Sequence, residues 1–183
     1  ARNGATSNDV RPAAEGIVTR GVLVDVARHL GVDWLEAGEP VMPSQVAAAL
    51  ENQGVEVRRG DAVLLRTGYG ARQRARGPDV MAQGGSSRAG WHVANLPWLH
   101  ERGVALIGAD TAQDVVPSGY RFSHNPVHTV GIVAMGLWLL DNCDLEPLAE
   151  ACAGRGRWDF QFTLAPLAIT GGTGSPANPL AVF

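Results

Sequence analysis

The stretch GIVTRGVLVDV, from Gly16 to Val26, has the clearest strand pattern in the sequence. It is rich in β-branched residues, and its apolar run from Val22 to Val24 is typical of a strand buried on both faces. A strand of this kind belongs in a sheet that helices cover. We therefore expect a strand here that ends at Asp25 and forms the middle of an α/β sheet.

The segments that follow alternate between helical and strand patterns. Pro43 stands where a helix begins, apolar residues follow it at helical spacing, and Gly54 is the stop. The later elements that we expect are a strand over Asp61 to Arg66, a short helix over Leu96 to Arg102, a strand over Val104 to Gly108, a helix over Pro126 to Met135, a helix from the N-cap Asp144 through Cys152, and a strand over Trp158 to Ile169 with one exposed face. This alternation predicts an α/β fold in which helices flank a sheet in a single compact domain.

The composition of the 183-residue chain limits the classes of protein to which it can belong. Hydrophobic residues make up 45% and charged residues 18%, and no apolar run approaches the roughly 20 residues of a membrane span. The net charge of −3 gives no general attraction for nucleic acid. We therefore expect a globular protein that binds neither nucleic acid nor a membrane.

The first residues differ in character from the rest. Residues 1–15 are a polar lead without the charged and then apolar pattern of a signal peptide, so we expect a cytoplasmic location. The lead starts at Ala1 with no Met before it, and it runs straight into a strand pattern typical of the middle of a fold. We expect a chain that was cut or processed, with one α/β domain over residues 16–183.

Two histidines, His124 and His128, stand four residues apart. On a continuous helix they would share a face and could chelate a metal ion. Pro126 lies between them, however, and marks the expected start of the helix, which leaves His124 in a loop and His128 in the first turn. The alternative is one histidine that packs within the structure and one that is solvated.

Carboxylates at strand ends are further candidates, because ligands of open α/β sheets gather at the carboxyl ends of the strands. Asp25, Asp110 and Asp141 occupy such positions. Each of them could instead cap a turn or pair with an arginine.

The stretch from Thr67 to about Gly90 is rich in glycine and arginine and is expected to be a long loop of the functional or mobile kind. Asp79 is its one acid, whereas the arginines in or beside it are Arg66, Arg72, Arg74, Arg76 and Arg88. Through Arg66 and Arg88 the loop could bind an anionic substrate. It could equally be a solvated lid or a contact to another subunit.

Three local patterns do not indicate a function. GGTGSP, from Gly171 to Pro176, resembles a phosphate-binding loop, but it has no Lys and no helix pattern follows it, so we expect a turn or interface loop. The G-x-S-x-G pattern of serine hydrolases does not occur. Cys143 and Cys152 lack C-x-x-C spacing, and we expect both to be buried, reduced thiols.

Five collinear stretches carry a family resemblance. They are GIVTRGVLVDV (Gly16 to Val26), LLRTG (Leu64 to Gly68), PWLHERGVALIGADT (Pro97 to Thr111), PVHTVGIVAMGLWLLDN (Pro126 to Asn142) and GGTGSPANPLAVF (Gly171 to Phe183). Together they resemble the cyclase family of metal-dependent hydrolases, which includes bacterial kynurenine formamidase and isatin hydrolase. The resemblance implies a compact α/β fold with a central, partly barrel-like mixed sheet and flanking helices, a divalent zinc or manganese ion, and hydrolysis of an amide, lactam or lactone.

The resemblance also implies which residues are functional. The family signature H-x-G-T-H-x-D-x-P-x-H supplies two His and one Asp to the metal, and this sequence does not contain it. The family's downstream histidine, which binds metal or acts as acid and base, matches His128. The glutamate ligand that follows falls near Asp141, with Asp in place of Glu and a spacing that is one residue longer. His124 is the alternative metal residue.

Two hypotheses follow. In the first, the chain is the carboxy-terminal portion of a metal-dependent hydrolase of a small molecule, and the remaining metal ligands lie on sequence outside this chain. In the second, it is a non-catalytic remnant, or a regulatory or assembly subunit that keeps the fold. We expect a homo-oligomer or a second chain with the missing segment, and no divalent metal held tightly by this chain alone. We also expect the apolar tail, Leu180 to Phe183, to pack into the body or against a partner subunit.

Overall fold

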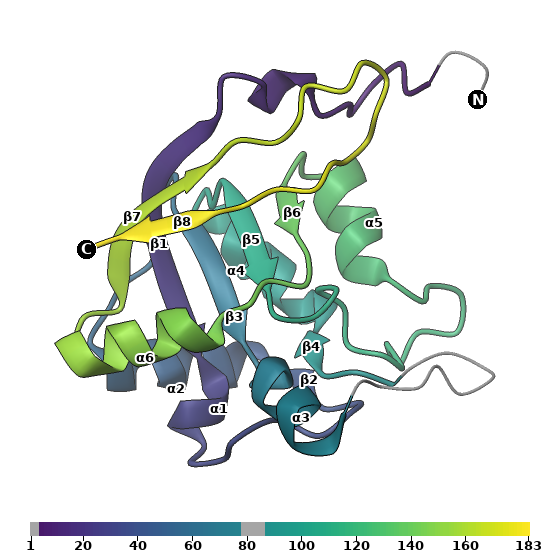
Figure 1. The fold of residues 1–183 in the computed structure, drawn as a ribbon. Coiled ribbons are helices and arrows are strands. Elements are labelled where there is room, and N and C mark those ends of the chain that lie inside the picture. Colours follow the sequence, from purple (N-terminus) through teal and green to yellow (C-terminus); the bar gives the residue numbers. More distant parts are fainter. Residues whose placement is uncertain (1–3, 78–86) are drawn as a thin grey trace.

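The computed structural model describes residues 4–77 and 87–183, which form an α/β fold built on a six-stranded mixed sheet (Figure 1). Along the sheet the strand order is β6-β5-β3-β1-β7-β8. The strands are β1 (Ile17–Asp25), β3 (Ala62–Arg66), β5 (Leu106–Ala109), β6 (Trp138–Leu140), β7 (Asp159–Leu164) and β8 (Leu180–Val182). From β1 to β6 neighbouring strands are parallel, whereas β7 is antiparallel to β1 and β8 is antiparallel to β7.

Helices cover both faces of this sheet. The helical elements are η1 (Arg11–Ala13), α1 (Val26–His29), α2 (Pro43–Gln53), α3 (Tyr69–Arg76), η2 (Val93–Asn95), α4 (Leu96–Glu101), α5 (Pro126–Val133) and α6 (Glu146–Arg155). On one face, residues of α2, α4 and α5 share a buried apolar cluster with alternate residues of β1, β3 and β5. On the other face, α6 packs with the remaining residues of these strands and with Phe160 and Phe162 of β7. A separate parallel pair joins β2 (Pro40–Val41) to β4 (Gly90–Trp91).

The predicted fold class is confirmed. The strand expected over Gly16 to Val26 is β1, and its register places it between β3 and β7 in the middle of the sheet. The helices expected at Pro43 and Pro126 begin at those residues. Within the described residues the sheet is open, so no closed barrel forms. None of the described helices has the length and apolar character to cross a bilayer.

Three predicted boundaries are wrong, each for a local reason. Asp144 does not cap a helix, because α6 begins at Glu146 with Leu145 as N-cap and a proline in its first turn. The strand expected to reach Ile169 ends at Leu164, shortly before Pro166, which has no N–H to donate to a ladder.

The third wrong boundary concerns the expected loop from Thr67 to Gly90. Tyr69–Arg76 is helix α3, which follows Gly68 in the left-handed conformation with φ 82°. The end of this stretch, Gly90, lies in β4. Asp79 lies outside the described residues.

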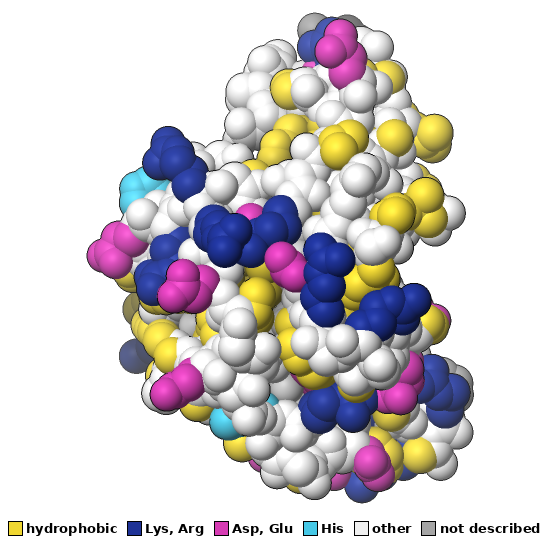
Figure 2. Space-filling model, turned by 90° about the vertical axis from the view of Figure 1, so that its left-hand side faces the viewer, with side chains coloured by type: hydrophobic (Ala, Val, Ile, Leu, Met, Phe, Trp, Pro, Cys, Tyr) yellow, Lys and Arg dark blue, Asp and Glu magenta, His cyan; other side chains and the backbone are white. Residues whose placement is uncertain are grey.

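The residues near the two ends of the chain pack against the body. The backbone N–H groups of Ala5 and Val10 donate to the carbonyls of Gly171 and Gly172, both at 2.8 Å, so the GGTGSP stretch holds the lead segment. The apolar tail joins the sheet, because β8 pairs with β7 and the ring of Phe183 lies 5.7 Å from that of Phe160, but the side chains of β8 remain exposed. On the face shown in Figure 2, arginine and acidic side chains are interspersed and form no uniformly basic area.

Candidate functional site

The polar groups of interest lie at the carboxyl ends of the parallel strands. Asp110 directly follows β5 and is buried beside the turn that follows β3. Its carboxylate accepts hydrogen bonds from the backbone N–H groups of Thr67, Gly68 and Tyr69 at 2.8 to 3.0 Å, and from the Thr67 hydroxyl at 2.8 Å. Burial raises the pKa of Asp110 to about 6, against the opposing effect of these donors. Asp110 therefore ties the start of α3 to the end of β5.

His128 lies in the first turn of α5, where Pro126 was expected to place it, and its ring contacts two carboxylates. Its Nδ1 lies 2.6 Å from Oδ2 of Asp114, and its Nε2 lies 3.1 Å from Oδ2 of Asp141. The hydrogen bond to Asp114, followed by that to Asp141, raises the pKa of His128 to about 9, although partial burial opposes the shift. The ring is therefore protonated at neutral pH.

The two carboxylates differ in their surroundings. The Asp114 side chain is 1% exposed, whereas that of Asp141, which follows β6, is 34% exposed. Asp114 also accepts the backbone N–H of Val127 at 2.6 Å and that of His128 at 3.2 Å. One carboxylate is thus part of the interior, and the other faces the accessible side of the ring.

Of the residues predicted from the sequence, the structure brings His128 and Asp141 together. His124 is exposed in the loop ahead of α5. Asp114 was missed, because it lies in an irregular segment after the strand end at Asp110. A search for acids at strand ends therefore selects Asp110 instead of Asp114.

The structure places the two predicted substrate-binding arginines differently. Arg66 is buried, with Nη1 2.7 Å from Asp25 and with Nε and Nη2 at 3.0 and 2.9 Å from Glu146. Its guanidinium is engaged on both sides in ion pairs that join β3 to β1 and α6. Arg88 donates from Nε to the backbone oxygen of Asp114 at 3.0 Å and from Nη2 to Asn125 at 3.1 Å. Arg88 therefore braces the segment that carries Asp114, beside the site.

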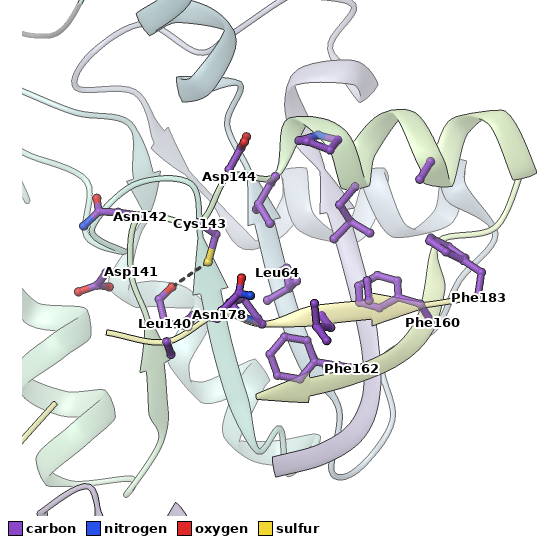
Figure 3. A pocket seen from close by; sticks show the side chains of 18 residues that line it. Leu64, Leu140, Asp141, Asn142, Cys143, Asp144, Phe160, Phe162, Asn178 and Phe183 are labelled. Atoms are coloured by element: carbon purple, nitrogen blue, oxygen red, sulfur yellow. Dashed lines mark hydrogen bonds between the residues drawn. The ribbon is translucent and has the colours of Figure 1, made fainter. Parts of the chain in front are cut away.

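Two hollows adjoin the turn that carries Asp141. One, of about 460 Å³, lies between α6, β7 and β8, with Asp141 at one end of its lining and Phe183 at the other (Figure 3). The rings of Phe160 and Phe162 make its wall apolar. The second, of about 540 Å³, is lined by α3 residues and Asp110. Both share residues 142–144, so this turn lies between the two hollows.

The residues at the site do not by themselves fit a catalytic metal. His128 Nε2 and the Asp141 carboxylate converge and have the chemistry of metal ligands. Across residues 4–77 and 87–183, no group of three or more His, Cys, Asp or Glu side chains could hold a metal ion. A catalytic zinc ion takes about three protein ligands and keeps one open position. Two donors fall short of that number.

The comparisons with known proteins agree with one another. Residues 3–113 match the model of the family described as "Putative cyclase". None of the curated proteins matches the chain. A crystal structure described as a novel cyclase is 30% identical, with a TM-score of 0.82 over 96% of this chain and 56% of that one.

Two more distant structures share the fold. Isatin hydrolase A from Labrenzia aggregata, bound to benzyl benzoate, is 22% identical with a TM-score of 0.73, over 97% of this chain and 66% of that chain. A structure described as a potential metal-dependent hydrolase with cyclase activity is 14% identical with a TM-score of 0.60, over 90% of this chain and 65% of that chain. The chain thus spans less than two thirds of the length of these relatives. On the family match and the 30% identical structure, the chain belongs to the cyclase family.

Proposed function

We propose that this chain is part of a metal-dependent hydrolase that cleaves the C–N or C–O bond of an amide, lactam or lactone. The observation that carries the proposal is the His128 ring, held between a buried and an exposed carboxylate at the carboxyl edge of the parallel strands. Ligands of open α/β sheets gather at this edge. Membership of the cyclase family and the fold shared with isatin hydrolase point to the same chemistry.

In this reaction the oxygen of water adds to the carbonyl carbon. One proton of the water ends on the carboxylic acid product, and the other ends on the departing nitrogen or oxygen. His128 is suited to the second transfer. Its pKa of about 9 keeps a proton on Nε2 at neutral pH, so the ring can deliver that proton to the leaving atom as a general acid. Asp141 contacts the same nitrogen at 3.1 Å and would give way to substrate.

A divalent ion can bind at this site only if ligands from outside the described residues complete its coordination. The family resemblance favours zinc or manganese, with Asp141 as the donor that this chain would contribute and His124 as the alternative, while His128 serves as the acid. The other ligands would come from sequence outside this chain, either on the same polypeptide or on a second one. The chain alone is expected to lose zinc and manganese on dialysis, which metal analysis of the dialysed protein measures.

The test is hydrolysis by the protein expressed from its complete reading frame, with zinc or manganese, on a panel of isatin, an aryl formamide and a lactone. Under the proposal at least one is opened. Replacing His128 by Ala then lowers turnover by about 10²- to 10⁴-fold, as expected for a lost general acid. The matched variant His124→Ala has a much smaller effect, because His124 is exposed in the preceding loop.

Two results would contradict the proposal. If no panel member is hydrolysed with either metal, the chain serves instead as a non-catalytic assembly or regulatory subunit. If His124→Ala abolishes activity and His128→Ala does not, the assignment of the histidine is reversed.

Assembly is a separate part of the proposal. Leu180 and Val182 of the edge strand β8 are 56% and 52% exposed, and an apolar sheet edge of this kind favours association. We therefore keep a homo-oligomer, or a complex with a second chain, as the expected state. Light scattering coupled to size-exclusion chromatography measures it, and a monomer at all concentrations would contradict it.

A further inference from the structure

The buried carboxylate of Asp114 makes contacts that no other residue of the site makes. One of its oxygens, Oδ2, contacts both the ring Nδ1 and the backbone N–H of His128, while Oδ1 accepts the backbone N–H of Val127. We propose that Asp114 is the positioning residue of His128, which fixes the proton on Nδ1 and leaves Nε2 as the nitrogen that meets substrate. That Nε2 acts on substrate rests on the proposed function, whereas the Nδ1 contact does not.

The direction of the hydrogen bond follows from the chemistry of the carboxylate. An ionised carboxylate only accepts hydrogen bonds, so at 2.6 Å the Nδ1 of His128 must be the donor. Oδ2 already accepts the backbone N–H of the same residue, so the ring is tied to the first turn of its own helix. Rotation of the ring by half a turn would place a C–H group against the buried carboxylate. Loss of a charge-assisted hydrogen bond disfavours that orientation by roughly tenfold to hundredfold.

Asp114 is itself held from several sides. Its N–H donates to the Ala112 carbonyl at 2.7 Å, its carbonyl accepts from Arg88, and the segment forms a bridge with Trp91 of β4. Gly90 permits this approach, since a Cβ there would lie 2.3 Å from the backbone oxygen of residue 113 and 2.9 Å from the carbonyl carbon of Asp114. The carboxylate therefore has little freedom to follow a moving ring.

Asp141 has a different role because it meets the other nitrogen. Its side chain is 34% exposed and lies on the turn between the two hollows. Removing it would free Nε2 and leave the Nδ1 contact in place. The variant Asp141→Asn is thus a matched control, in which the second carboxylate on the same ring is neutralised.

The test is NMR of the chain itself with ¹⁵N-labelled histidine, and it needs neither metal nor substrate. Wild type should show a far-downfield proton on Nδ1 of His128 that exchanges slowly with water. Asp114→Asn should lose that resonance, because the amide cannot accept from both the helix N–H groups and the ring, while Asp141→Asn should retain it. If Asp114→Asn fails to fold, the wild-type spectrum and the Asp141→Asn spectrum still decide the matter.

Two results would overturn the proposal, namely a wild-type Nδ1 without a protected proton, or loss of that proton in Asp141→Asn but not in Asp114→Asn. In the complete enzyme, Asp114→Asn should lower kcat by about 10²- to 10⁴-fold with KM nearly unchanged, because binding contacts remain and the ring is misdirected. If the complete enzyme hydrolyses nothing, the proposed function fails while the NMR result still stands. If hydrolysis occurs and kcat is unchanged in Asp114→Asn, the positioning role fails alone.

Discussion

Replacing Asp110 by Ala should be one of the most destabilising single changes in this protein, because its buried carboxylate accepts hydrogen bonds from a row of donors. Thr67 and Gly68 donate their backbone N–H groups to it from buried positions. In Asp110→Ala both buried N–H groups lose this acceptor. An unsatisfied buried donor costs about 1–3 kcal/mol, so the variant should lose about 2–6 kcal/mol of unfolding free energy. That is a large share of the roughly 5–15 kcal/mol typical of a folded protein.

The assay is urea unfolding at pH 7, followed by tryptophan fluorescence and circular dichroism, with the slope of the transition as a check on two-state behaviour. Thr67→Val is the matched control, since it removes only the hydroxyl donor to the same carboxylate and should cost about 1 kcal/mol. Asp110→Asn, which keeps one acceptor oxygen, should fall between the two. If Asp110→Ala cost no more than Thr67→Val at an unchanged slope, the reasoning from unsatisfied donors would be refuted.

The remaining predictions concern the pH dependence, one packed glycine and the tail. The folded pKa of His128 is about 9 and its ordinary value is 6.5, so the stabilisation by the charged ring is complete below pH 6.5 and is lost as the pH rises to 9. Over this window the unfolding free energy of wild type, measured with urea, should fall by up to about 3 kcal/mol relative to that of His128→Gln. The same pH dependence in both proteins would contradict the prediction. In Gly21→Ala the new Cβ would lie 2.3 Å from the buried ring of Phe160, so about 1–3 kcal/mol should be lost, whereas Gly131→Ala, whose nearest contact is 3.6 Å, should change the urea midpoint little; equal midpoints would show that the ring moves aside. Deleting residues 180–183 removes β8 and should lower solubility and the urea midpoint, and a deletion without either effect would mean that the tail contributes nothing to the body.

The elements predicted well from the sequence are those whose burial leaves a periodic signature. β1 has an apolar run because both of its faces are covered, and the prolines at the starts of α2 and α5 fix the first turn. α3 was missed because none of its residues is buried, so its eight residues carry no apolar face to detect. The glycine and arginine residues of this stretch are typical of a loop, which is why a loop was predicted.

The site was predicted in part, and the missing part depends on tertiary contacts. His128 was selected by the family resemblance, together with a proline that fixes its place in a helix, and Asp141 by the same resemblance and its position after a strand. Asp114 reaches the ring through an irregular segment that no spacing rule describes. Arg66 is a residue type that often binds anionic substrates, but its ion-pair partners Asp25 and Glu146 are distant in sequence. Only the folded chain shows that its guanidinium is held in these two ion pairs.

The position of β1 in the sheet has a consequence for how the chain acquires its structure. Among the described strands β1 comes first along the chain, yet one of its neighbours is β7, with Ile17 opposite Leu164. Pairing elements so far apart in the chain requires closing a long loop before any contact rewards it, which slows folding. During synthesis, β1, α2 and β3 leave the ribosome with one long strand edge open until β7 follows. The nascent chain is then most exposed to aggregation. The yield of refolding should therefore fall as the protein concentration rises, whereas the stability of the native protein should depend less on concentration.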